Sequence, residues 1–133
     1  MSEQENINLV RQSYEAFKRG DLEALLNLYA EDIVWEIPGP SSVPTSGTRR
    51  GRDQVKQFFA QLGELLEAQS FEPQEYIAQG NQVVVLGEYT WRVKSTGRTF
   101  SSRWAHVSTL GNGKITRLRE YTDTAAAAEA FGQ

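Results

Sequence analysis

The spacing of apolar residues changes once along the chain, near Phe71. Before it, apolar residues recur every three or four positions, which is typical of amphipathic helices. After it, four segments with strand-like patterns are separated by tight glycine-containing turns, over residues 71–79, 82–93, 98–110 and 114–122. Helices followed by an antiparallel meander predict an α+β fold, with the helices packed on one face of a strongly curved, mainly antiparallel sheet.

Local signals predict where the first two helices begin and end. Ser2 and Glu5 fit a capping box at the start of the first helix. The buried stripe of that helix is expected to contain Ile7, Val10, Tyr14 and Phe17. Gly20 suits the end of the helix, and Asp21 can cap a second helix that should end near Ala30.

The middle of the chain predicts one strand, one loop and one further helix. Residues 33–37 form the strand, and residues 39–48, rich in Ser, Pro and Gly, form a surface loop. The third helix opens at Gly51, and its buried stripe is expected to contain Val55, Phe58, Phe59, Leu62, Leu65 and Leu66. A short last helix follows the final strand, with Thr122 or Asp123 as its cap.

Length and composition exclude several classes of function. The 133 residues predict a single domain, residues 1–133, with enough core to fold without disulfides. There is no Cys and only one His, so thiol catalysis and a multi-histidine metal site are excluded, and we expect no metal and no cofactor. A net charge of −3 does not favour nucleic acid. The polar N-terminus and the lack of a bilayer-length apolar run predict a cytoplasmic protein without membrane contact.

The hairpin of residues 98–122 carries the strongest candidate site, but two registers are open for it. A three-residue loop at residues 111–113 pairs Leu110 with Lys114 and Trp104 with Glu120, which puts four side chains on one face: Trp104, His106, Leu118 and Glu120. A two-residue turn at Asn112 and Gly113 places His106 opposite Arg119 and separates the acid from the imidazole. We favour the first register because it brings the acid and the imidazole together.

A glutamate beside a histidine in a mostly apolar cavity suits general acid–base chemistry. Burial raises the pKa of a carboxyl group towards neutrality, and a neighbouring imidazole can hold the group or share its proton. Glu120 and His106 are therefore the candidate catalytic residues. The competing interpretations are a hydrogen-bonded core His106 and a structural ion pair of Glu120 with Arg119 or Arg103.

Helices packed on a curved sheet form a cone whose open end is a natural pocket for a small hydrophobic ligand. Tyr14 could direct its hydroxyl into that pocket from the first helix, and further aromatic side chains could form its walls. The candidate substrate-binding residues are Tyr14, Trp35, Phe59, Tyr89, Trp91 and Trp104. Ordinary core packing is the alternative role for each of them.

Several motifs together resemble a known family. They include YEAF at residues 14–17, the Gly20-Asp21-Leu22 turn, residues 29–35 ending in Trp35, the TGRTFS run at residues 96–101, and REYTD at residues 119–123. With His106 and the Gly113-Lys114-Ile115 turn, they resemble SnoaL-like proteins of the nuclear-transport-factor-2-like (NTF2-like, ketosteroid-isomerase-like) superfamily over nearly the whole chain. The resemblance implies a conical α+β fold with a deep apolar pocket, and dimerisation through the sheet.

The resemblance also implies roles for individual residues. In the polyketide cyclases of this family, an acid on the last strand abstracts a proton and a histidine on the preceding strand supports it; these positions match Glu120 and His106. The chain departs from the cyclases at Trp104, where they have glutamine, and at Glu120, where they have aspartate. Ile37 and Ala105 stand where ketosteroid isomerases carry their base and their acidic oxyanion donor, so that mechanism is not expected. The Asp-Arg-Asp set of limonene epoxide hydrolases is not matched either.

Two functions from different classes follow. The first is a cofactor-free isomerase, cyclase or lyase that uses Glu120 as a general base on a small hydrophobic carbonyl compound. The second is a small-molecule binding or sensing protein with the same pocket and no turnover. The side of the sheet on which Glu120 lies, and whether an arginine holds it, separate the two.

Overall fold

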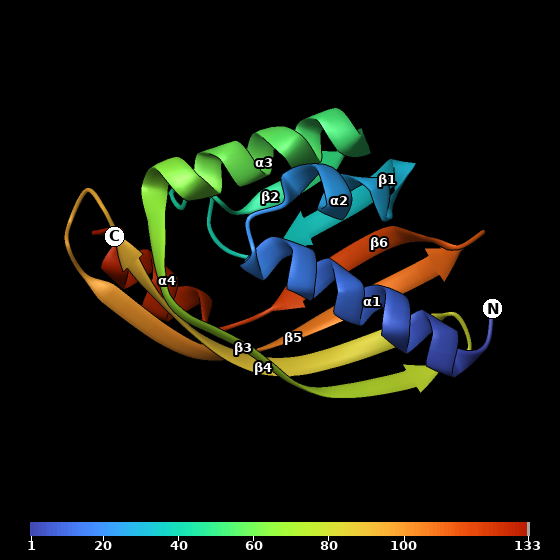
Figure 1. Ribbon diagram of the computed structural model, residues 1–133. Coiled ribbons are helices and arrows are strands. Elements are labelled where there is room, and N and C mark those ends of the chain that lie inside the picture. The colour runs from blue at the N-terminus through green and yellow to red at the C-terminus, as the bar shows by residue number, and fades with distance from the viewer. Residues whose placement is uncertain (133) are drawn as a thin grey trace.

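The computed structural model describes residues 1–132 and confirms the α+β class. Six strands form one curled sheet in the order β2-β1-β6-β5-β4-β3, and every neighbouring pair is antiparallel except β1 with β6 (Figure 1). The strands are β1 (Tyr29–Ile37), β2 (Gly47–Arg50), β3 (Leu66–Gln79), β4 (Gln82–Val93), β5 (Thr99–Gly111) and β6 (Lys114–Tyr121). The helices are α1 (Glu3–Lys18), α2 (Leu22–Asn27), α3 (Gly51–Leu65) and α4 (Thr124–Ala130).

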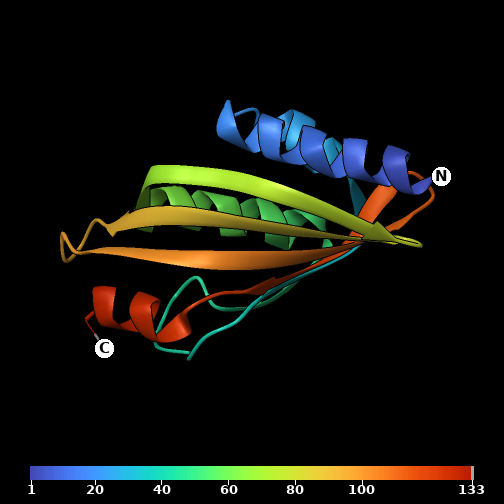
Figure 2. The same cartoon turned by 90° about the horizontal axis from the view of Figure 1, so that it is seen from below.

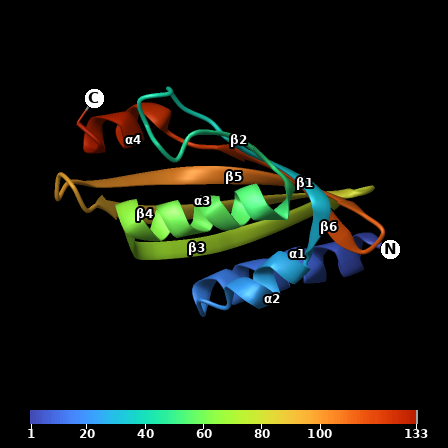
Figure 3. The ribbon, with the colours of Figure 1, turned by 90° about the horizontal axis from the view of Figure 1, so that it is seen from above.

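The helices surround the curled sheet on three sides. α1 and α2 lie beyond β3, α4 lies beyond β5, and α3 lies between them (Figures 2 and 3). This arrangement leaves the concave face of the long strands β4 and β5 pointing into the molecule. No helix of residues 1–132 is long and apolar enough to cross a bilayer.

Both predicted N-terminal caps are confirmed. The Ser2 hydroxyl accepts a hydrogen bond from the Glu5 amide at 3.1 Å, and the Glu5 carboxylate accepts one from the Ser2 amide at 2.9 Å. Gly20 has φ +73°, and Asp21 then accepts from the Ala24 amide at 3.1 Å. The Ser2 box therefore caps α1, which buries Val10 and Tyr14, and Asp21 caps α2.

Four predicted boundaries are wrong because strand pairing overrides the local pattern. The first strand begins at Tyr29 and not at residue 33. The second helix ends at Asn27, not near Ala30, because Tyr29 already pairs with Ile115 of β6. The strand expected to begin at Phe71 begins at Leu66, which pairs with Val93. The predicted loop 39–48 ends early, since Gly47 starts the short strand β2 along β1.

The favoured register of the β5–β6 hairpin is wrong, although its face grouping is correct. The turn has two residues, Asn112 and Gly113, both with positive φ, as a type I′ turn requires. A bulge then leaves Thr116 without a cross-strand partner, so that pairing resumes with Thr109 opposite Arg117. The extra residue moves β6 by one position and brings His106 directly opposite Glu120.

Of the two residues predicted as possible N-caps of the last helix, Thr122 and Asp123, the N-cap is Asp123. Its carboxylate accepts a hydrogen bond from the Ala126 amide at 2.9 Å. The β4–β5 turn anchors the other end of α4, because the Thr96 hydroxyl donates to the Ala130 carbonyl at 2.6 Å. α4 is therefore held close to the open end of the sheet.

Gly87 provides a test of the packing on the concave face. A Cβ added there would lie 2.6 Å from the Glu72 carbonyl oxygen and would overlap the indole of Trp104. We expect Gly87→Ala to lower the free energy of unfolding in urea by about 1–3 kcal/mol, because the indole has to move. Gly63→Ala is the control, since its Cβ would meet no atom within 4 Å, and it should leave stability unchanged or raised. Equal effects of the two variants would contradict this packing.

Candidate functional site

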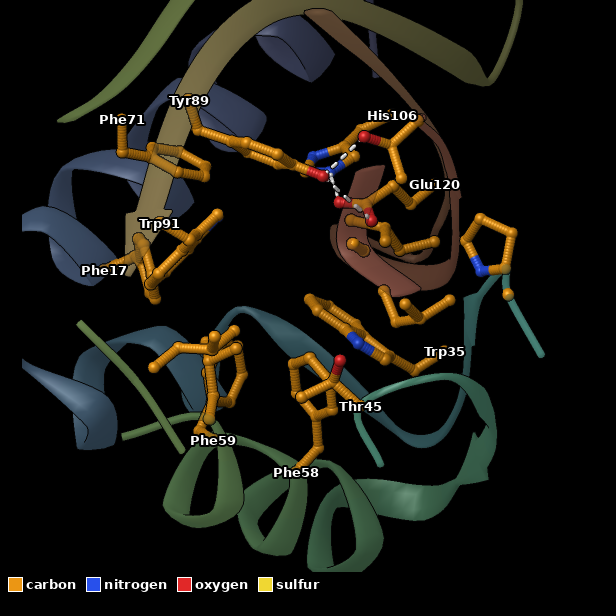
Figure 4. Close-up of a pocket in the computed structure, with 18 of the residues that line it drawn as sticks. Phe17, Trp35, Thr45, Phe58, Phe59, Phe71, Tyr89, Trp91, His106 and Glu120 are labelled. Atoms are coloured by element: carbon orange, nitrogen blue, oxygen red, sulfur yellow. Dashed lines mark hydrogen bonds and ion pairs between the residues drawn. The ribbon is translucent and has the colours of Figure 1, made fainter. Parts of the chain in front are cut away.

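A cavity of about 110 Å³ lies between the concave face of the sheet, α1, α3 and α4 (Figure 4). Most of its wall is aromatic or aliphatic. The polar side chains on that wall are few: Ser13, Tyr14, Tyr29, Thr45, Tyr89, His106, Glu120, Thr122 and Thr124. Such a hollow selects apolar ligands and leaves orientation to a small set of polar groups.

Glu120 and His106 meet inside this cavity. His106 Nε2 lies 2.8 Å from Glu120 Oε2, and both side chains are almost fully buried. On the other side of the ring, His106 Nδ1 lies 2.8 Å from the Tyr14 hydroxyl of α1. The three groups form one continuous line of hydrogen bonds from α1 across β5 to β6.

The direction of these hydrogen bonds follows from the tyrosine. Burial raises the pKa of Tyr14 well above its usual value, so the phenol keeps its proton and can donate it to Nδ1. The imidazole then carries its own proton on Nε2 and donates to the Glu120 carboxylate. In this assignment the neutral ring serves as acceptor on one side and as donor on the other.

The second oxygen of Glu120 has a much weaker partner. Thr122 Oγ1 donates to Ser102 Oγ at 3.0 Å, so it is an acceptor for the Tyr89 hydroxyl, which lies only 2.6 Å away. The same hydroxyl is 3.5 Å from Glu120 Oε1, at the limit of a hydrogen bond. Glu120 therefore has one oxygen held by His106 and one oxygen that a ligand can reach.

Arginine does not hold Glu120. Arg103 lies on the opposite face and pairs with Glu88 at 3.4 Å. Arg119 points away from the cavity because neighbouring residues of a strand face opposite sides. Among the described residues, the close hydrogen-bond partner of the Glu120 carboxylate is His106, and this removes the structural arginine pair as an explanation for Glu120.

The structure brings together most of the residues that the sequence suggested. The cavity wall includes Tyr14, Trp35, Phe59, Tyr89, Trp91, His106 and Glu120. Trp104 shares their face but is not on the wall: its ring stacks on His106 with centroids 4.2 Å apart, and it is only 3% exposed. Trp104 therefore supports the histidine from behind.

Most wall residues were not among the sequence candidates, and the polar ones include Thr122 and Thr45. Thr122 was predicted only as a possible helix cap, and Thr45 lay in a segment predicted to be a surface loop. Thr45 is 8% exposed because the β1–β2 loop folds over the mouth of the cavity, where Arg49 donates to the carbonyls of Thr45 and Pro44 at 2.7 and 3.2 Å. The Ser- and Pro-rich composition of that loop gave no signal for this burial.

Comparison with known proteins assigns the family. The sequence model described as the SnoaL-like domain matches residues 10–118. The chain belongs to the SnoaL-like domain family. The chain is also 29% identical to the uncharacterised protein Rv0034 of Mycobacterium tuberculosis (strain H37Rv), over 98% of each sequence.

Solved structures of NTF2-like proteins share the fold. An NTF2-like protein from Burkholderia xenovorans LB400 is 44% identical over 99% of both chains, with a TM-score of 0.91. TerC, co-crystallised with polyporic acid, is 30% identical over 97% of this chain and 99% of its own, with a TM-score of 0.86. The SnoaL-like member described here therefore has the conical NTF2-like fold expected from its motifs.

The buried tyrosines of the SnoaL-like domain should make the protein less stable as the pH rises above about 10. Burial raises the pKa of Tyr14, Tyr29 and Tyr89, whereas the unfolded chain ionises near pH 10. Above that pH the unfolded state binds fewer protons, so the free energy of unfolding should fall by about 1.4 kcal/mol per pH unit for each such tyrosine. The stabilisation is complete below pH 10 and is lost as the pH rises.

Urea unfolding between pH 8 and pH 11.5 measures this slope. Tyr29→Phe should reduce the fall in the free energy of unfolding by the contribution of one tyrosine, about 1.4 kcal/mol per pH unit. It should change the free energy of unfolding little at pH 8. Tyr121→Phe, at a side chain that is 52% exposed, is the control and should keep the wild-type slope. A slope that stays the same in Tyr29→Phe would show that this phenol is not the buried group responsible.

Proposed function

We propose that this SnoaL-like protein is a cofactor-independent isomerase, cyclase or lyase that acts on a small hydrophobic carbonyl compound. Glu120 is the general base, and His106 is the positioning residue that holds it. The observation that carries the proposal is the unequal pairing of the two Glu120 oxygens inside an apolar cavity. Oε2 accepts from His106 at 2.8 Å, whereas Oε1 has only a contact of 3.5 Å.

In the proposed reaction, Oε1 takes a proton from the carbon next to the ligand carbonyl. The electron pair of that C–H bond moves to the carbonyl oxygen and forms an enolate, and Glu120 becomes a neutral carboxylic acid. The acid can return the proton to a different carbon, which completes an isomerisation. In a cyclase, the enolate carbon instead attacks a second carbonyl carbon of the ligand, whose C=O π bond opens, and the new alkoxide takes the proton from Glu120. In a lyase, the enolate re-forms the carbonyl, a double bond forms between the α- and β-carbons, and the leaving group departs from the β-carbon with the proton of Glu120.

The surrounding residues suit these steps. The hydrogen bond from Tyr14 keeps the histidine proton on Nε2, facing Glu120, and the stacked indole of Trp104 limits rotation of the ring. Thr45 lies across the cavity from Glu120 and supplies a hydroxyl for the carbonyl oxygen (Figure 4). The apolar wall strengthens these interactions because it excludes water.

A non-catalytic binding protein is the second candidate function. The feature that favours it is the wall itself, which is rich in aromatic side chains and is suited to holding a flat apolar ligand. The co-crystal of the 30% identical TerC with polyporic acid is in keeping with a ligand-binding role for this fold. In this reading Glu120 and His106 orient the ligand without transferring a proton.

Exchange of α-protons separates the two functions without a known substrate. The full-length protein is incubated with 2-tetralone in D₂O, and loss of the α-proton signals is followed by NMR. The wild type should accelerate the exchange, and Glu120→Gln should lower that acceleration by a factor of about 10²–10⁴, because it keeps the volume but removes the base. Glu88→Gln, on the outer face, is the matched control and should behave as the wild type.

The outcomes are distinct. Acceleration that persists in Glu120→Gln contradicts the role of this residue as the base. Binding of 2-tetralone without acceleration in the wild type favours the binding protein. Circular dichroism of each variant checks that the fold is intact.

The proposal also includes a homodimer formed through the outer face of the sheet. Three apolar residues on this face, Val84, Leu86 and Val107, are only half-buried in the single chain, and Tyr121 is 52% exposed. A partly exposed apolar patch on a sheet suits contact with a second copy.

Light scattering over a range of concentrations tests this contact. The wild type should have the mass of a dimer, and Leu86→Lys should shift it to the monomer, since a charge would be buried in the contact. Lys56→Ala, at an exposed position of α3, is the control. A monomeric wild type would contradict the proposed dimer.

A further inference from the structure

A second cavity, of about 440 Å³, adjoins the one that contains Glu120. It lies between the α1–α2 turn, the C-terminal half of α3 and the start of β3. The two cavities share part of their walls, including Phe17, Phe59, Phe71 and Trp91. In Figure 4 these four side chains lie on the side of the first cavity away from Glu120.

The residues that line both cavities include three aromatic side chains in contact with one another. The Phe17 ring lies 5.1 Å from the Phe71 ring and 5.9 Å from the Phe59 ring, measured between centroids. All three rings are only half-buried, so they are not locked in place by a closed core. Rotation of Phe17 and Phe59 about their χ angles would join the cavities without moving a helix.

The volumes of the two cavities favour a single ligand that occupies both. Ligand sites commonly enclose about 300–1,000 Å³. The first cavity, of about 110 Å³, falls below this range and holds only a small head group. The second supplies the missing volume on the other side of the shared aromatic side chains.

We propose that the two cavities form one channel for an elongated ligand. The carbonyl head of the ligand reaches Glu120, and an uncharged alkyl or aryl tail passes between Phe17 and Phe59 into the second cavity. The chemistry of the head rests on the proposed function, whereas the path of the tail rests on the shape and the lining of the cavities.

The lining of the second cavity determines the chemistry of the tail. Its wall is mainly apolar and includes Leu22 of α2 and Ala68 of β3. The charged groups on it, Lys18 and Glu72, are half-exposed and pair with each other at 3.8 Å. Charge is thus confined to a solvent-exposed pair, and the tail along the wall is hydrocarbon.

A series of phenyl alkyl ketones tests the channel. Binding of acetophenone through to octanophenone to the full-length protein is measured by isothermal titration calorimetry. Each methylene that enters the channel should raise the affinity about fourfold, the equivalent of about 0.8 kcal/mol per buried CH₂. An affinity that does not change with chain length in the wild type overturns the proposal, and so does the absence of binding for every ketone.

Two variants locate the tail. Ala68→Trp fills the second cavity from β3, and Leu22→Trp fills it from α2. If one variant fails to fold, the other still tests the position of the tail. Both should leave acetophenone affinity within twofold of the wild type and abolish the gain with chain length. Ser70→Trp is the matched control, because Ser70 is exposed on the same strand and lines neither cavity, and it should keep the full gain. A full gain in folded Ala68→Trp or Leu22→Trp would show that the tail goes elsewhere.

Glu120→Gln separates failure of the channel from failure of the proposed function. The variant should keep the gain in affinity with chain length, because the tail does not touch Glu120. A chain-length gain together with unchanged proton exchange in Glu120→Gln would support the channel and refute the base. Exchange lost in Glu120→Gln without a chain-length gain in the wild type would refute the channel alone.

Discussion

The contact between His106 and Glu120 is the constraint around which the rest of the site is arranged. A carboxylate placed in an apolar interior costs several kcal/mol unless it is paired and hydrogen-bonded. The imidazole supplies a hydrogen bond at 2.8 Å, and its other nitrogen is hydrogen-bonded to Tyr14 of α1. The capped, rigid α1 is thus tied to the last two strands by a polar line through the middle of the cone.

The bulge at Thr116 makes this contact direct. Without the extra residue, the two-residue turn would put His106 opposite Arg119 and would turn Glu120 to the outer face. The sequence contained the turn, since Asn112-Gly113 is a strong type I′ signal, but nothing in the pattern around Thr116 marks a bulge. The correct face for Glu120 was nevertheless predicted, because the favoured register differs from the real one by two residues and therefore keeps the same alternation.

Similar limits explain the other differences between prediction and structure. Strand alternation predicts the side of the sheet on which Trp104 lies, but not how deeply its side chain is buried. The extent of burial decides whether a side chain lines the cavity or packs behind a residue that does. The start of β3 and the strand β2 depend on partners distant in sequence, which single-sequence patterns do not encode. The helix caps were predictable because each depends on residues only three positions apart.

The hydroxyls around Glu120 show how a sheet can leave one acceptor free in a buried site. Tyr89 donates to Thr122, Thr122 donates to Ser102, and Ser102 donates to the Arg103 carbonyl. The short hydrogen bond of the Tyr89 hydroxyl, at 2.6 Å, therefore goes to Thr122, and its contact with Glu120 Oε1 is longer, at 3.5 Å. A buried carboxylate normally collects every available donor. Here Oε2 is held by the histidine at 2.8 Å, whereas the donor nearest to Oε1 is 3.5 Å away and makes its shorter contact with Thr122. Oε1 is therefore the Glu120 oxygen at which a ligand would meet an acceptor that has no short hydrogen bond.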